Sequence, residues 1–198
     1  MRTKSFLFAM VLFVIGNAAN AQDVRFGVKA GANFSNINAQ NSEASWGSRT
    51  GVHLGLLAHI HLNKKWAVQP ELVYSMQGAK STVAGDETQT INLNYLNVPV
   101  LLQYMFDNGF RMQTGPQLGF LMSATTKIGS GEAVKNTEFF NKTDFSWSFG
   151  AGYLSDMGLG VDARYNLGLN DAYKPGGLRE TNSVFQLGLF YMFNHKSK

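Results

Sequence analysis

Residues 24–34 read VRFGVKAGANF, a stretch in which apolar side chains alternate with charged, amide or glycine residues. Successive side chains of a β-strand point to opposite faces, so this alternation predicts a strand with one apolar and one polar face. Seven further segments repeat the pattern, at residues 51–62, 66–77, 94–106, 110–122, 144–153, 159–168 and 185–193. The sequence therefore predicts an all-β chain whose strands are about long enough to cross a bilayer when tilted.

The connections between the predicted strands alternate in length. Three are tight turns at residues 63–65, 107–109 and 155–157, and the four at residues 37–49, 79–90, 125–143 and 170–181 are long and polar. Short turns at one end and long loops at the other are typical of outer-membrane barrels, whose short turns face the periplasm. We therefore expect an eight-stranded antiparallel up-and-down transmembrane β-barrel with short periplasmic turns and long extracellular loops.

The composition excludes several other classes of protein. The chain has 198 residues, of which 15% are charged, and no cysteine. The absence of cysteine excludes disulfide scaffolds, thiol catalysis and cysteine-based zinc sites. The formal net charge is +4, but the basic residues are scattered and form no stripe. We therefore expect no nucleic-acid partner.

The first residues have the pattern of an export signal. Residues 1–21 read MRTKSFLFAMVLFVIGNAANA, in which Arg2 and Lys4 precede an apolar run and the last residues form a small-x-small cleavage site. The apolar run has about 10 residues, too few for a membrane-spanning helix, which needs roughly 20. We expect residues 1–21 to be a secretory signal peptide, residues 22–193 the barrel and residues 194–198 a short polar tail. The expected location is the outer membrane.

Alternation alone does not say which face of the barrel is wet, because a soluble lipocalin-like barrel has the same period with the faces exchanged. The polar face here carries Gly, Gln, Asn and Ser with few charges, which suits a narrow lumen. Aromatic residues gather near the strand ends on the apolar face, as in interfacial girdles. These are Trp66, Tyr104, Phe106, Phe110, Tyr153, Tyr191 and Phe193 near the turns, and Phe34, Phe120, Phe145, Trp147, Tyr165 and Phe185 nearer the loops. We expect the apolar face to touch lipid.

The few charges on the polar face should form pairs inside the lumen, because an isolated ion in a closed interior costs several kcal/mol. The cations of this predicted network are Arg25, Lys29, Arg111 and Arg164, and the anions are Glu71 and Asp162. We expect a hydrogen-bonded plug and no open pore, because an eight-stranded barrel is filled by its own side chains.

Some residues fit the predicted strands less well. Leu57 is the one apolar residue on the polar face of its segment, and Asn94 is placed on the polar face with Asn97 and Gln103. Three prolines, Pro70, Pro99 and Pro116, fall inside predicted strands of a closed barrel, where each removes a ladder hydrogen bond. We expect β-bulges at these prolines.

Six segments carry a family resemblance: QPELVYSMQGAK (69–80), LNYLNVPVLLQYMF (93–106), TGPQLGFLM (114–122), GAGY (150–153), DARYNLGL (162–169) and FQLGLFYMF (185–193). They resemble the PorT-type small outer-membrane β-barrel proteins, an outer membrane protein β-barrel domain family of Bacteroidetes-like bacteria. The resemblance implies the same barrel fold and, since the eponymous member is linked to secretion of surface proteins, a role in supporting secretion. A terminal aromatic residue, here Phe193, is the usual recognition signal for the barrel assembly machinery.

Two chemical alternatives involve the histidines. His53, His59 and His61 share one strand face, and the last two could bind a metal with Glu71. The alternative, which we favour, is that they are lumen hydrogen-bonding groups beside Gln69, so no metal or other cofactor is expected. Ser75 opposite His53 would be the catalytic pair of a hydrolase, but no third group orients the imidazole. We therefore expect no enzyme.

The long loops contain Trp46, Phe139 and Phe140 among polar residues. These aromatics are either contact points for a partner or surface glycan, or they pack against the barrel mouth. The sequence thus favours a structural or interaction role in the cell envelope, with outer-membrane lipids and envelope or secretion proteins as partners. A narrow channel for small solutes and a soluble ligand-binding barrel are the alternatives.

Overall fold

The structure is a computed structural model, and it describes residues 24–39, 46–82, 87–172 and 180–193. The expected signal peptide (residues 1–21) and the expected tail (residues 194–198) lie outside the described residues. Within the described ranges, no helix has the length and apolar character needed to cross a membrane.

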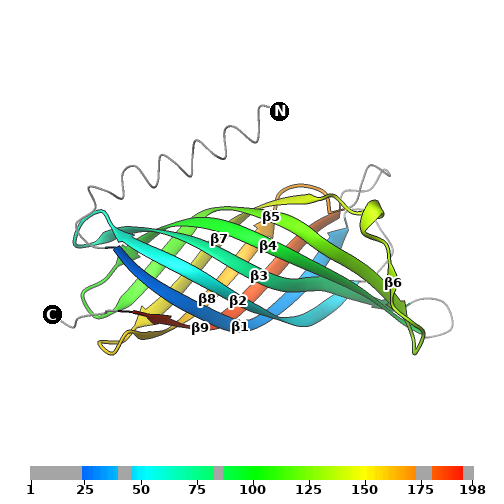
Figure 1. Cartoon of the computed structure of the whole chain (residues 1–198), viewed down its shortest axis with the longest axis horizontal. Helices are drawn as coiled ribbons and strands as arrows, with labels where there is room; N and C mark the ends of the chain where they lie inside the picture. Colours follow the sequence, from blue (N-terminus) through cyan, green and yellow to red (C-terminus); the bar gives the residue numbers. More distant parts are fainter. Residues whose placement is uncertain (1–23, 40–45, 83–86, 173–179, 194–198) are drawn as a thin grey trace.

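The described residues form eight long strands that close into an antiparallel barrel (Figure 1). Neighbouring strands along the chain pair with each other, and β1 pairs with β9 to complete the ring. The strands are β1 (Val24–Ala39), β2 (Trp46–His61), β3 (Trp66–Thr82), β4 (Thr88–Met105), β5 (Phe110–Ile128), β7 (Thr143–Leu154), β8 (Leu159–Gly168) and β9 (Glu180–Met192). The predicted eight-stranded transmembrane barrel is therefore confirmed.

Two small elements extend the barrel at the loop end. The short strand β6 (Val134–Lys135) pairs with the end of β5, and the 3-10 helix η1 (Thr137–Phe139) follows it. Figure 1 shows β6 at the opposite end of the barrel from the start of β1 and the end of β9. The first and last strands thus begin and end on the short-turn side, which faces the periplasm in barrels of this kind.

The outer wall is apolar over the middle of the barrel, and the inner face is polar. Phe26, Leu54 and Leu189 have about three-fifths of their surface exposed, at 63%, 65% and 58%. Lys29 and Arg164, by contrast, are only 3% and 2% exposed. Such a surface is stable against acyl chains and not against water. The apolar side of the alternation points outward, as expected.

The aromatic residues form bands near both ends of this apolar wall. On the turn side the rings of Trp66, Tyr104, Phe106 and Phe110 contact one another in sequence, with centroids 5.0, 4.9 and 5.4 Å apart. Nearer the loops, Phe34 lies against Phe185. Aromatic bands of this kind mark the two membrane interfaces of a transmembrane barrel.

The lumen is narrow enough to require glycine on the inner face. A Cβ atom added to Gly31 would lie 2.1 Å from the carbonyl oxygen of Leu187 and 2.7 Å from a ring carbon of His53. No larger residue fits at this position without moving the backbone of the neighbouring strand. The interior is accordingly filled by side chains.

The strands extend further toward the loops than the sequence predicted. β3 continues to Thr82 and β5 to Ile128, whereas loops were expected from residues 79 and 125. The reason is that the alternation continues there with its faces exchanged. On β4, Leu96 and Val98 point outward, but beyond them Asn92 and Asn94 take the outer face and Ile91 and Leu93 are buried inside. The placement of Asn94 on the lumen face was therefore wrong.

A β-bulge in the neighbouring strand allows the same exchange on β5. The register between β4 and β5 shifts between Asn94 and Tyr95, which pair with Ser123 and Leu121 and leave Met122 as the extra residue. Beyond the bulge, Ala124 turns inward. Outside, the amide of Asn94 donates a 2.9 Å hydrogen bond to the hydroxyl of Ser123. On β4 and β5 the strand part just beyond the bulge is therefore polar outside and apolar inside, the reverse of the lipid-facing wall.

The expected bulges at the prolines are absent from the described ladder, and that prediction was wrong. Pro70, Pro99 and Pro116 each keep a partner on one side, at Val100, Gln117 and Trp147 respectively. On the other side the ladder is interrupted and resumes in the same register. Each proline thus costs local pairing on one edge without adding a residue, because only the missing N–H has to be tolerated.

Candidate functional site

Four charged side chains meet in the lumen and form what we call the ion cluster: Lys29 of β1, Glu71 of β3, and Asp162 and Arg164 of β8. Arg164 donates two hydrogen bonds to the two oxygens of Glu71, at 2.9 and 2.8 Å. Lys29 Nζ lies 3.1 Å from Asp162 Oδ2 and 3.4 Å from Glu71 Oε2. Asp162 also accepts from Arg164 at 3.4 Å. Two cations and two carboxylates therefore balance.

The ion cluster is enclosed, so its charge balance matters for stability. The four side chains have between 0% and 8% of their surface exposed. Burying ions is costly, and the cost is offset only when each has well-placed partners of opposite charge. Gln69 supplies one more bond, donating to Glu71 Oε1 at 2.8 Å. The cluster connects β1, β3 and β8, no two of which are neighbours in the ring. It therefore holds side chains together across the lumen.

The other two residues of the expected network lie apart from the ion cluster. Arg111 is 5% exposed and its guanidinium lies over the ring of Phe190, 5.5 Å from the centroid. Among the described residues Arg111 forms no ion pair, and its Nε and Nη1 atoms have no hydrogen-bond partner. Arg25 is half-buried near the start of β1. The structure thus brings together four of the six charges named from the sequence.

A layer of amide and hydroxyl groups fills the lumen on the loop side of the ion cluster. Asn33 donates to Ser75 at 2.9 Å and accepts from Gln186 at 2.9 Å. From Gln186 the chain of bonds continues through Asn166 to Ser148, at 3.0 and 2.7 Å. These bonds link β3, β1, β9, β8 and β7. The layer rigidifies the interior and satisfies buried polar groups.

The Ser75 and His53 pair does not have the arrangement of a catalytic dyad. The two residues are cross-strand neighbours, but Ser75 Oγ accepts from Asn33 and His53 Nδ1 lies 2.8 Å from Asn33 Oδ1. Ser75 is fully buried and His53 is 2% exposed. A nucleophile needs both its base and access to substrate, and here neither is provided.

His59 and His61 are hydrogen-bonded or stacked within the lumen. His59 Nδ1 lies 3.2 Å from Gln69 Oε1, and the His59 and His61 rings meet edge to face at 4.6 Å. Both oxygens of Glu71 are held by Arg164. No group of three or more metal-ligating side chains occurs in the described part of the chain.

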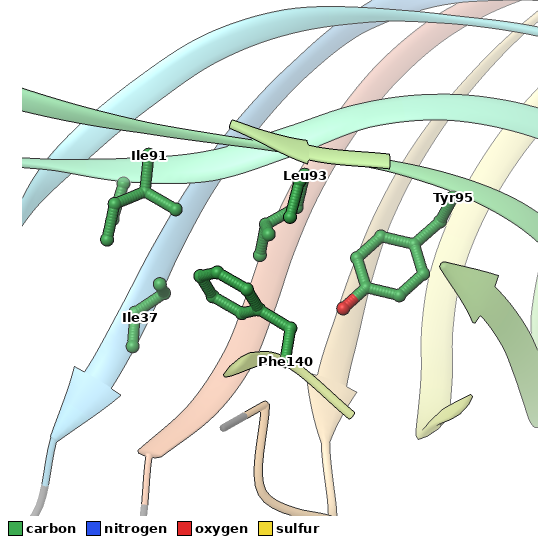
Figure 2. Close-up of a cluster of buried hydrophobic side chains, with 7 residues drawn as sticks. Ile37, Ile91, Leu93, Tyr95 and Phe140 are labelled. Carbon is green, nitrogen blue, oxygen red and sulfur yellow. The ribbon is translucent and has the colours of Figure 1, made fainter. Parts of the chain in front are cut away.

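Apolar side chains close the lumen at the loop end. This mouth cluster consists of Ile37, Ala79, Ile91, Leu93, Tyr95, Ala124 and Phe140, all 0% or 1% exposed. Figure 2 shows the ring of Phe140 reaching in from the loop after η1 and lying between Ile37, Leu93 and Tyr95. The next residue, Asn141, is held by hydrogen bonds to the carbonyl oxygens of Ala172 and Asp171, both at 2.8 Å. The loop is therefore fastened across the mouth.

A second apolar group lies in the lumen toward the turn end, beside the buried polar side chains of Arg111, Gln103 and His59. This turn-end cluster consists of Leu57, Leu154, Phe190 and Met192, each at most 7% exposed. It explains the misfit in the second strand, because Leu57 faces inward as a member of this cluster. An apolar cluster therefore lies toward each end of the polar lumen.

The three loop aromatics take different places. Phe140 is fully buried, so it packs against the barrel mouth and is not a contact point for a partner. Phe139, its neighbour, is 61% exposed and faces solvent. Trp46 is the first residue of β2, opposite Ser81 of β3. One sequence feature could have identified the mouth cluster: Ile37, Ile91 and Leu93 are apolar residues in the positions that face the lumen.

These features define an outer-membrane β-barrel with a filled lumen. A family model for the outer membrane protein beta-barrel domain matches residues 20–174, and the chain belongs to this family. A search of curated proteins gives no match. The location of the protein is accordingly the outer membrane.

Solved structures with a similar fold are also outer-membrane barrels. Neisserial surface protein A (NspA) is 15% identical, with a TM-score of 0.56, covering 87% of this chain and 100% of its own. Ail, the attachment invasion locus protein of Yersinia pestis, is 13% identical with a TM-score of 0.52, again covering 87% of this chain and 100% of its own. At these identities the similarity establishes the fold alone.

Proposed function

We propose that this protein is a non-conducting, non-catalytic barrel of the outer membrane that acts by contact with partners in the cell envelope. The observation that carries the proposal is the filled lumen: a neutral ion cluster, an amide layer and two apolar clusters occupy it. Water and ions need a continuous hydrated path to cross, and closely packed side chains leave little room for one. The parts of the barrel left for contact with partners outside the membrane are therefore its two ends.

The loop end offers a surface suited to contact. Phe139 is 61% exposed, Val134 of β6 is 65% exposed and Ile128 of β5 is 47% exposed. Exposed apolar groups on a rigid support favour association with another molecule. Because β5 extends beyond the apolar wall, these three side chains lie away from that wall. We propose that a partner at the cell surface binds here.

The resemblance to PorT-type barrels supports a proposal for the class of partner. We propose that the barrel supports the secretion or retention of surface proteins, and that its partners are proteins of the envelope. The exposed apolar surface at the loop end supports a protein partner, because aromatic anchors contribute strongly to protein–protein contacts.

Conductance measurements test whether ions can pass through the filled lumen. We expect planar bilayers containing the purified barrel to show only the baseline current of protein-free bilayers, because the lumen is filled by the side chains of the barrel itself. A narrow solute channel would instead give discrete current steps with wild-type protein. Such steps, if they persisted after removal of contaminating porins, would contradict the proposal.

Affinity capture tests the contact surface. Full-length barrel immobilised in detergent is exposed to solubilised envelopes, and the captured proteins are quantified by mass spectrometry. Replacing Phe139 with serine should reduce capture of the main partner at least about tenfold, the effect of losing an aromatic anchor. The matched control is Met157→Ser, at a turn-end residue that is 77% exposed. Equal capture by wild type and Phe139→Ser would refute this surface.

A further inference from the structure

The outer wall contains a hollow of about 390 Å³ over β7 and β8, flanked by β5 and β9. Its floor includes Ala151 and Ala163, which are cross-strand partners. Its rim includes Phe110, Tyr153 and Leu187. The hollow exists because two small side chains lie side by side on an outer face where most neighbours are bulky. Its volume is within the roughly 300–1,000 Å³ of small-ligand pockets.

The hollow lies within the apolar wall and toward the periplasmic side. Phe110 is the first residue of β5 after a tight turn, and Tyr153 is the last residue but one of β7 before the next. These two residues pair with each other in the aromatic band on the turn side. From there the hollow runs to Ala163 and Leu187 in the middle of their strands. Its lining is almost wholly apolar.

The barrel wall is thin behind the hollow. Asp162 pairs with Gly152 on one side and Gly188 on the other, so neither cross-strand neighbour contributes a side chain to the inner face. All three residues also line the hollow. Asp162 is a member of the ion cluster and lies 3.1 Å from Lys29. Close apolar cover on the outside would keep water away from these buried charges, whose pairing depends on exclusion of solvent.

We propose that the hollow binds one acyl chain of a phospholipid from the periplasmic leaflet. An alkyl chain matches a recess whose lining is almost wholly apolar and that opens directly into the acyl phase. A second copy of the protein is a poorer match, because a stable interface needs about 20–30 residues on each side, whereas nine residues line this hollow. The position between the turn-side aromatic band and mid-wall selects the leaflet.

Native mass spectrometry of the detergent-purified, full-length barrel tests this proposal. The wild-type protein should retain one phospholipid. Replacing Ala163 with leucine fills the hollow and should lower the retained fraction about tenfold, since several methylene contacts are lost. The matched control is Ala58→Leu, an outward alanine of β2 on the opposite side of the ring. This control should retain the lipid as the wild type does.

Each of the following results would overturn the proposal. Wild-type barrel without bound lipid means that the hollow holds nothing specifically. Equal retention by wild type and Ala163→Leu places the lipid elsewhere. A retained glycolipid, the outer-leaflet type, means that the leaflet is wrong, and a dimer that is lost in Ala163→Leu means that the occupant is a second copy. None of these results depends on the conductance or capture experiments, so failure here is distinct from failure of the proposed function.

Discussion

Replacing Glu71 with alanine is expected to lower the free energy of unfolding by about 3–5 kcal/mol, the usual cost of removing one partner from a buried ion pair. The side chain of Glu71 is fully buried and receives two hydrogen bonds from Arg164 and one contact from Lys29. Without it, two cations share the single carboxylate of Asp162 in a closed lumen. Urea unfolding in lipid vesicles, followed by tryptophan fluorescence, measures the loss.

Two variants isolate the effect of charge imbalance. Glu71→Leu combined with Arg164→Met removes one charge of each sign and leaves Lys29 paired with Asp162, so it should lose less than Glu71→Ala. The exposed Glu132 is the control for removing a carboxylate, and Glu132→Ala should be neutral within about 0.5 kcal/mol. If Glu71→Ala lost less than about 1 kcal/mol, the ion cluster would not be a stabilising unit.

Replacing Phe140 with alanine is expected to be the second large effect. The ring fills the mouth cluster and is completely buried (Figure 2). Truncating a buried phenylalanine typically costs about 3–5 kcal/mol through lost burial and the cavity left behind. Because Phe140 also fastens its loop across the mouth, residues 136–142 should be cleaved faster by added protease. Unfolding and limited proteolysis of the reconstituted barrel measure the two consequences.

The adjacent residue provides the control for this prediction. Phe139 has the same side chain one position earlier in the chain and is 61% exposed. Phe139→Ala should therefore change stability by no more than about 0.5 kcal/mol and leave the cleavage rate unaltered. Equal effects of the two alanine substitutions would mean that Phe140 does not close the mouth.

The fold could be predicted because its cause is local. Period-two alternation, as in residues 24–34, and the alternating loop lengths each follow from neighbouring residues. The ion cluster was predictable only in part. Glu71 and Asp162 were the two carboxylates named for the predicted network, so some pairing was expected. That Arg164 and not Arg111 binds Glu71 depends on which strands face each other across the lumen, and sequence spacing does not determine this.

The mouth cluster and the turn-end cluster were not predicted, for a different reason. A single orientation was assigned to the alternation along each strand, so Leu57 was treated as a misfit and the region beyond Asn94 as loop. The expected loops at residues 79–90 and 125–143 include strand residues of β3, β4 and β5, and there, as at Leu57, the environment of a strand face changes along the strand. Alternation shows that successive side chains lie on opposite faces of a strand. The same face stays apolar only where the medium outside the barrel stays the same along the strand.

The exchange of faces on β4 fixes the depth of the protein in its membrane. Moving the barrel outward would bring Leu96 into water, and moving it inward would bring the amide of Asn94 among acyl chains, where a polar group is costly. Vertical displacement is therefore penalised in both directions. In a membrane of unsuitable thickness, the lipids around the barrel should stretch or compress to meet it, at fractions of a kcal/mol per ångström of mismatch, while the protein keeps its level.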